Sequence, residues 1–177
     1  MRTVTIALGV AVTLLAACST RYAPSIDDRA AARIRFVVTY PDHTWVSALK
    51  KDCFTSTIGT ETLAVLMRST LREPQRVSIG MPLDELPIKA RFRERSVPAG
   101  SPINIAFFGH SLTNPVGGES WSCAVAVRLV PAVGADYEMK FTQIGDQCRL
   151  SVDQLRTISD GHLERTPVQE VTRLNRC

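Results

Sequence analysis

Histidine is scarce in this 177-residue chain, and the spacings that mark metal and nucleotide sites are missing. The three histidines lie far from one another and from the cysteines, and no two cysteines have the C-x-x-C spacing of zinc sites. The sequence contains no phosphate-binding G-x-x-x-x-G-K-[ST] loop, no dinucleotide fingerprint and no calcium loop of the form D-x-[DN]-x-[DN]-G. We therefore predict that the protein uses no metal and no cofactor.

Patterns of a catalytic nucleophile are also missing. The segment 117–121 reads Gly-Gly-Glu-Ser-Trp, which is not G-x-S-x-G, and it lies in a predicted loop. Ser111 follows His110 directly, but adjacent residues of an extended chain point to opposite faces. We predict a protein that is not an enzyme, and a cell-wall or lipid hydrolase is the less favoured alternative.

The chain carries little net charge and has no block of charge of one sign. Its 21 basic and 17 acidic residues give a formal net charge of +4. Bases alternate with acids, as in Arg-Phe-Arg-Glu-Arg at 91–95. Because such a field is weak, it does not indicate a nucleic-acid partner, and we predict none.

The apolar stretch at the N-terminus is too short to span a bilayer, which needs roughly 20 residues. It runs from Val4 to Leu15, follows Arg2 and ends in small residues, as secretory signals do. The tetrapeptide Leu-Ala-Ala-Cys at 15–18 resembles the lipobox of bacterial lipoproteins. The resemblance implies a signal peptide over 1–17, removed before Cys18, and lipidation of Cys18 with thioether-linked lipid and palmitate. The alternative is an ordinary signal peptide that happens to precede a cysteine.

The remaining chain divides into a tether and one domain. Residues 18–32 are small and polar without an apolar period, as expected of a lipidated tether. Residues 33–177 are enough for one domain with a core but too few for two. Ser19, rather than Asp, follows the lipidated cysteine, which in enteric-type sorting favours the outer membrane. We expect the domain to face the periplasm.

Alternating apolar residues predict a mainly β domain. The expected strands lie near 33–39, 88–93, 103–107, 121–129, 137–141, 148–152 and 168–171. The three strands between 121 and 155 read as a β-meander, while Leu63, Leu66 and Met67 at helical spacing predict one short helix near 60–72, although Thr62 and Val65 suit a strand. The fold class is an antiparallel β-sandwich of about six to eight strands.

Four cysteines remain after Cys18, and an even number in an exported chain indicates disulfides. Three pairings are open. In a flat meander, Cys123 and Cys148 lie roughly 9.5 Å apart, too far for a bridge. They come together if the sheet twists sharply at Gly145-Asp146 or if the third strand crosses to the opposite sheet. Both lie on apolar faces, which favours an intersheet Cys123–Cys148 bridge. Cys53 then fastens the terminal Cys177.

Aromatic and imidazole side chains form the candidate contact residues for a ligand or partner. Tyr40, His43 and Trp45 lie around the first turn, and His110 begins a loop rich in glycine and proline. Flat rings of this kind stack on carbohydrate or peptide. The simpler interpretation is that the aromatics close the core at one end of the sandwich.

Several short motifs resemble a group of small uncharacterised lipoproteins of Gram-negative bacteria. These motifs are Ser-Ile-Gly-Met-Pro at 78–82, Val-Pro-Ala-Gly-Ser-Pro-Ile at 97–103, Ser122-Cys123, Pro131, Gly134, Asp-Tyr-Glu at 136–138 and Cys148. The resemblance covers about residues 75–153. It implies a small disulfide-bonded β-sandwich in the outer membrane but no activity, because the group has none assigned.

Together these features predict a non-catalytic envelope lipoprotein, anchored through Cys18, whose sandwich binds or braces another envelope component. The expected partners are the membrane and an envelope protein. The alternative is a ligand-binding or enzyme-inhibitor module at the envelope, with loops 41–47 and 109–120 carrying the contact.

Overall fold

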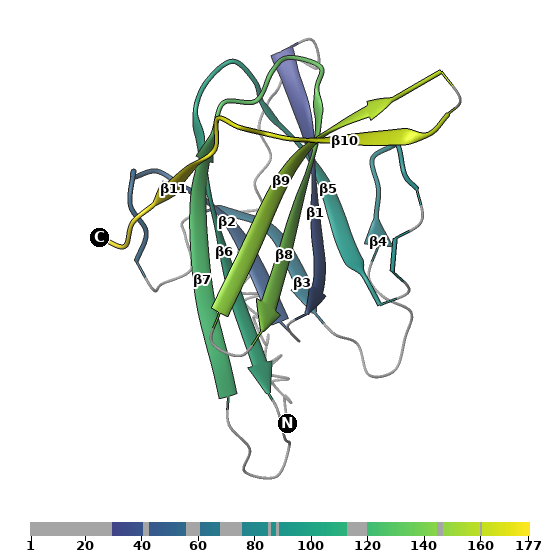
Figure 1. Cartoon of the computed structure of the whole chain (residues 1–177). Coiled ribbons are helices and arrows are strands. Elements are labelled where there is room, and N and C mark those ends of the chain that lie inside the picture. The colour runs from purple at the N-terminus through teal and green to yellow at the C-terminus, as the bar shows by residue number, and fades with distance from the viewer. Residues whose placement is uncertain are drawn as a thin grey trace, which may run out of the picture.

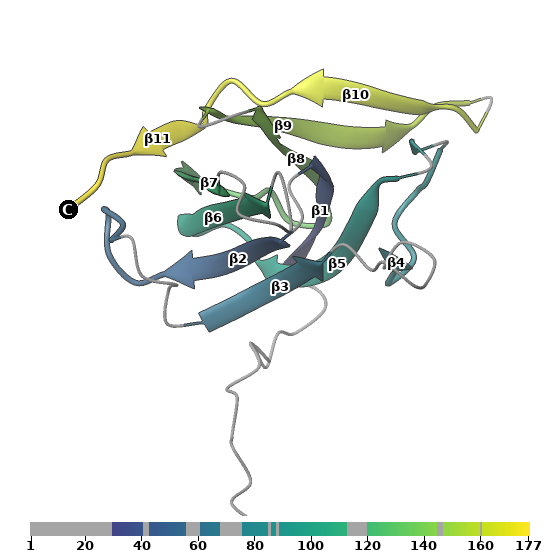
Figure 2. The same ribbon diagram turned by 90° about the horizontal axis from the view of Figure 1, so that it is seen from below.

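The computed structural model describes residues 30–40, 43–55, 61–67, 76–84, 86–87, 89–112, 120–144, 147–159 and 161–177. They form two β-sheets that pack face to face (Figures 1 and 2). One sheet has the strand order β10-β9-β8-β1-β5-β4 and the other β11-β7-β6-β2-β3. The predicted β-sandwich is confirmed, with eleven strands in the described residues rather than six to eight. In that part of the chain, no helix has the length and apolarity to cross a membrane.

The strands of the six-stranded sheet are β1 (Ala31–Tyr40), β4 (Arg76–Val77), β5 (Arg91–Pro98), β8 (Asp136–Ile144), β9 (Gln147–Thr157) and β10 (Leu163–Pro167). Those of the five-stranded sheet are β2 (His43–Leu49), β3 (Glu61–Met67), β6 (Ile103–Leu112), β7 (Ser120–Leu129) and β11 (Thr172–Leu174).

The core lies between the two sheets and follows the alternation of the sequence. In β1, Ile34, Phe36 and Val38 all point inward and are fully buried. Phe107 of the opposite sheet packs edge-on against Phe36, with ring centroids 5.9 Å apart, and stacks on Phe141 of β8 at 5.5 Å. These three phenylalanine rings hold the two sheets face to face, because large rings contribute much of the buried apolar area.

The first strand is central, and one of its two pairings is parallel. β1 pairs antiparallel with β5 and parallel with β8, and β4 also pairs parallel with β5. The expectation of purely antiparallel pairing is therefore wrong for these two pairs. Alternation along a strand reports which faces are buried but not the direction of the neighbour, and the long chain between β1 and β8 permits a parallel crossover.

The expected meander over 121–155 is wrong for its first pair of strands, which do not lie side by side in one sheet. β7 lies in the five-stranded sheet, whereas β8 and β9 form a hairpin in the other. The chain crosses between sheets at 130–135, where Gly134 has a φ of 71°. Packed sheets are ~10 Å apart, a distance that this connection spans easily.

The helix expected near 60–72 is wrong over the described residues 61–67, which form strand β3. Its ladder with β2 shifts register opposite Val46 and Ser47, so that Leu63 is an extra residue between Ala64 and Thr62. Leu63 and Leu66 are both buried in the core. Because a β-bulge turns an i, i+3 pair to the same side of a strand, it mimics helical spacing.

Two expected boundaries also differ. β1 begins at Ala31, inside the expected tether, and Ala32 is fully buried opposite Val97. The strand expected at 168–171 is instead the connection between β10 and β11. Val168 and Val171 still pack against the core from that connection, which explains their apolar character.

Candidate functional site

The outer face of the five-stranded sheet carries two rows of side chains across three strands. His43 of β2 pairs with His110 of β6, and Trp45 pairs with Phe108. The His43 and Trp45 rings stack with centroids 6.0 Å apart. All four side chains are partly exposed on this outer face, whereas the inner face of the same strands is buried in the core.

The third strand, β7, extends both rows and completes a hollow. Ser122 lies opposite His110, and Ala124 lies opposite Phe108. A hollow of about 380 Å³ opens here, bordered on one side by Arg176. The surface is concave here because the small side chains of Ser122 and Ala124 on β7 lie beside the larger rings on β2 and β6. We call this surface, formed by Trp45, Phe108, His110, Ser122, Ala124 and Arg176, the aromatic hollow.

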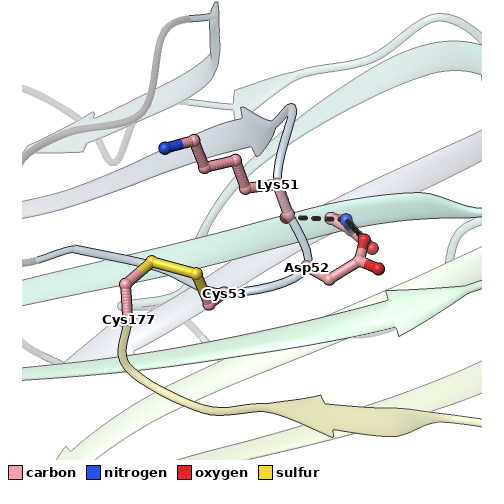
Figure 3. The surroundings of a disulfide bond; sticks show 5 residues. Lys51, Asp52, Cys53 and Cys177 are labelled. Carbon is pink, nitrogen blue, oxygen red and sulfur yellow. Dashed lines mark hydrogen bonds between the residues drawn. A yellow bond between two sulfur atoms is a disulfide. The ribbon is translucent and has the colours of Figure 1, made fainter.

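The C-terminal segment determines how much of the sheet face is covered. Phe54 pairs with Arg176, and the Cys53–Cys177 disulfide joins the two segments (Figure 3). Phe54 and Leu174 close over Ala106 and Ala126, the next row of the same face. The guanidinium of Arg176 lies 6.0 Å from the centre of the Phe54 ring, at the margin of the cover. The aromatic hollow is thus the part of this face that the C-terminal segment leaves accessible.

Three of the four predicted contact residues come together. His43, Trp45 and His110 share the outer face of one sheet, whereas Tyr40 ends β1 in the other sheet and its side chain lies outside the described residues. The interpretation that His43 and Trp45 close the core at one end of the sandwich is wrong, because both face outward. Of the expected contact loops, residues 41–42 and 113–119 lie outside the described residues.

Both predicted disulfides are present in the structure. Cys123 of β7 and Cys148 of β9 join the two sheets, with Cα atoms 5.8 Å apart. Cys53 and Cys177 have Cα atoms 5.0 Å apart. The sheet crossing that makes the first bridge possible lies between β7 and β8 rather than before β9. Cys18 lies outside the described residues.

A second cluster of charged side chains lies on the outer face of the six-stranded sheet. Arg35 of β1 is fully buried between Glu94 of β5 and Glu138 of β8. It donates two hydrogen bonds to Glu94 Oε1, at 2.9 and 2.8 Å, and one to Glu138 Oε2 at 3.4 Å. The segment 78–84 covers Arg35, and the Nη2 atom of Arg35 donates a hydrogen bond to the Pro82 carbonyl at 2.6 Å.

Glu94 holds the covering segment by its other oxygen. Its Oε2 accepts hydrogen bonds from the Ser78 hydroxyl at 2.7 Å and from the amides of Ile79 and Met81 at 2.6 and 3.2 Å. Burial raises the pKa of Glu94, but these hydrogen bonds and that of Arg35 lower it by more, so the pKa lies below its ordinary value of 4.5. Glu94 therefore remains a carboxylate at neutral pH.

The far end of the covering segment is fastened to β10. Asp84 accepts two hydrogen bonds from Arg165, which also donates to Glu138 at 3.1 Å. The hydrogen bonds from Arg165 hold the pKa of Asp84 below its ordinary value. Arg165 lies 81 residues from Asp84 in the sequence, so this pairing depends on the fold. Figure 2 shows the ribbon after β4 rising toward the β9–β10 hairpin.

The motifs singled out in the sequence meet at this charged cluster. The segment 78–82 supplies the donors to Glu94, and the segment 136–138 supplies Asp136 and Glu138. Asp136 pairs with Arg33 through two hydrogen bonds of 2.6 and 2.7 Å. All donors and acceptors named here are occupied by the protein itself. We therefore regard the charged cluster as a structural element and the aromatic hollow as the candidate binding site.

The fold and the hollow together define a disulfide-linked β-sandwich with a partly aromatic contact surface on one outer sheet face. Among the residues that the structure describes, no three His, Cys, Asp or Glu side chains gather as metal ligands do. In comparisons with family models, with curated proteins and with solved structures, nothing matched this chain.

Proposed function

We propose that this chain is a non-catalytic, lipid-anchored protein of the bacterial cell envelope, whose β-sandwich binds another envelope component through the aromatic hollow. The anchor is Cys18, and the location is the periplasmic face of the outer membrane. The two disulfides support export to an oxidising compartment. The resemblance to small Gram-negative lipoproteins supports the same location.

The observation that carries the binding role is the aromatic hollow itself. Trp45 and Phe108 are paired across β2 and β6 on an outer sheet face, and both remain partly exposed, although Phe108 also packs edge-on against Phe54 with ring centroids 6.4 Å apart. The few residues that carry most of the binding energy at protein contacts are enriched in tryptophan, tyrosine and arginine. The hollow offers Trp45, with Arg176 at its margin. An envelope protein that inserts an apolar side chain into the hollow fits this surface.

A second candidate function is the binding of a small ligand such as a glycan. The specific observation in its favour is the stacked His43–Trp45 pair, which presents a flat face beside hydrogen-bonding groups. Sugar rings stack on such faces while their hydroxyls bond to neighbouring polar groups. The cross-linking experiment below separates the two candidates by the nature of what is captured.

The lipid anchor predicts the behaviour of a Cys18→Ala variant. We expect it to incorporate no labelled palmitate and to accumulate as an unprocessed or wrongly cleaved precursor, because the thioether bond needs the Cys18 sulfur. The wild-type chain labelled in parallel is the control. Equal labelling of both chains would contradict lipidation at Cys18.

A cross-linker placed in the hollow tests the binding surface. We expect a photoreactive benzophenone residue at Ser122, an exposed position bordering the hollow, to trap one discrete partner in intact cells. The matched control is the same residue at Lys140, which is exposed on the other sheet. Capture of a protein at position 122 alone supports the first candidate, and capture of glycan supports the second. Identical products from both positions would contradict a binding role for the hollow.

A further inference from the structure

The end of the sandwich where β1 begins gathers two turns and the entry of the chain. The amide of Ala99 donates to the Ala30 carbonyl at 3.0 Å, and that of Gly134 donates to the Ala31 carbonyl at 2.8 Å. Gly100 donates to the Pro131 carbonyl at 2.8 Å, which ties the two turns to each other. The β5–β6 and β7–β8 connections therefore surround the start of β1, as Figure 1 shows at its upper edge.

Two apolar side chains at this end face solvent. Val130 and Val133 have 51% and 61% of their surface exposed. Both belong to the connection that adjoins the start of β1, so their exposure is concentrated where the chain enters the fold. Val130 and Val133 lie three residues apart in one connection, and exposed apolar side chains that gather on a surface mark contacts with membranes or proteins.

The polar groups near this turn add positive charge. Lys50 and Lys51 are exposed, and the Lys51 carbonyl accepts a hydrogen bond from Asn104, the second residue of β6 (Figure 3 shows Lys51). The acid Asp52 forms an ion pair with Arg128, and Glu61 lies opposite Ala48 at the start of β3. Lys50 and Lys51 together outnumber this one remaining carboxylate, and cations are attracted to anionic lipid surfaces.

We propose that this end of the sandwich rests on the lipid surface, with Val130 and Val133 inserted at the headgroup level. The inference rests on the proposed anchor at Cys18. Eleven residues lie between Cys18 and Ala30, so the length of the extended chain keeps Ala30 within ~40 Å of Cys18. The start of β1 is therefore the part of the domain closest along the chain to the anchor, while the ten residues of β1 carry its far end ~33 Å onward. This orientation turns the His110 end of the aromatic hollow toward the periplasm.

A depth-sensitive fluorescence experiment tests the orientation. The proposed mature chain, residues 18–177, is coupled through Cys18 to a maleimide lipid in vesicles of phosphatidylethanolamine and phosphatidylglycerol. It contains every described strand and both disulfides, and the disulfide-bonded cysteines do not react with maleimide. Tryptophan is introduced by Val133→Trp or, as a matched control, by Ile144→Trp, whose native side chain is equally exposed at 61% but ends β8 at the opposite end. The signal of the chain without an added tryptophan is subtracted.

With lipids brominated on their acyl chains, we expect the Val133→Trp signal to be quenched at least about twofold and the Ile144→Trp signal to stay unquenched, since interfacial insertion buries side chains by ~5–10 Å. Val130→Trp is expected to behave as Val133→Trp does. Equal quenching at both ends, or none at 133 and 130, would overturn the proposal. Because the coupling is chemical, the result does not depend on lipidation in the cell, which the palmitate experiment tests separately.

Discussion

Replacing Arg35 with methionine is expected to lower the free energy of unfolding by about 3–5 kcal/mol, the usual cost of removing one partner from a buried ion pair. Arg35 is fully buried, and its loss leaves the Glu94 and Glu138 carboxylates without their central cation. It also leaves the partly buried Pro82 carbonyl without its donor. Urea unfolding at neutral pH measures the change.

The control is Arg128→Met, which breaks an ion pair between partly exposed side chains on the other sheet. We expect its effect to be much smaller, because water and salt screen exposed pairs. If Arg35→Met yields no folded protein, Glu94→Gln tests the same network while keeping the side-chain shape. An effect of Arg35→Met no larger than that of Arg128→Met would show that the charged cluster does not hold the sheet.

The pH dependence of the Arg35→Met effect follows from Glu94. Its folded pKa lies below the ordinary 4.5, so its contribution to stability is present above pH 4.5 and is lost as the pH falls through the depressed folded value. The difference between wild type and variant is therefore expected to shrink in acid.

Removing the Cys53–Cys177 disulfide is expected to cost about 4–5 kcal/mol on the model that a bridge restricts the unfolded chain. The two cysteines are 124 residues apart in sequence, so the closed loop is long. The double variant Cys53→Ala with Cys177→Ala is compared with wild type by urea unfolding. Thiol titration of the unfolded, unreduced wild type checks that no cysteine among the four is a free thiol.

The matched control for this prediction is Cys123→Ala with Cys148→Ala, whose cysteines are only 25 residues apart. The loss expected from that shorter loop taken alone is smaller, roughly 3.5 kcal/mol. Only the first variant releases the segment that carries Arg176 and borders the aromatic hollow. A negligible loss in the Cys53–Cys177 variant would mean that the C-terminal segment is held by its noncovalent contacts.

The sequence predicted the buried faces well because they depend on local alternation. Ile34, Phe36 and Val38 are buried as their spacing indicates, and so are Tyr137, Met139 and Phe141. The disulfide pairing was also predicted, because two cysteines on inward faces of opposite sheets satisfy bridge geometry. Strand direction and sheet membership were not predictable in this way, since the parallel β1–β8 pairing and the crossing at 130–135 depend on the whole fold.

The candidate site was predicted in part for the same reason. His43, Trp45 and His110 stood out by residue type, but Phe108 is a partner only because β2 and β6 are paired in register. Arg176 is distant in sequence from the other hollow residues and reaches them through the Cys53–Cys177 bridge. For Arg35 the sequence showed a polar residue on an outer face, and only the covering segment 78–84 makes that face buried. The Ser-Ile-Gly-Met-Pro motif was the one available signal of this cover.

The central place of β1 has a consequence for how the chain assembles. Arg33 of β1 lies beside Asp136 of β8, 103 residues later in the chain, and β5 on the other flank also follows by many residues. In a chain that crosses a membrane N-terminus first, β1 emerges long before either partner. Folding of this sheet therefore has high contact order. Under the proposed export, it waits until translocation has delivered β8. Until then β1 would be an alternating strand with two unpaired edges, a form prone to aggregation, and the chain would need protection during that interval.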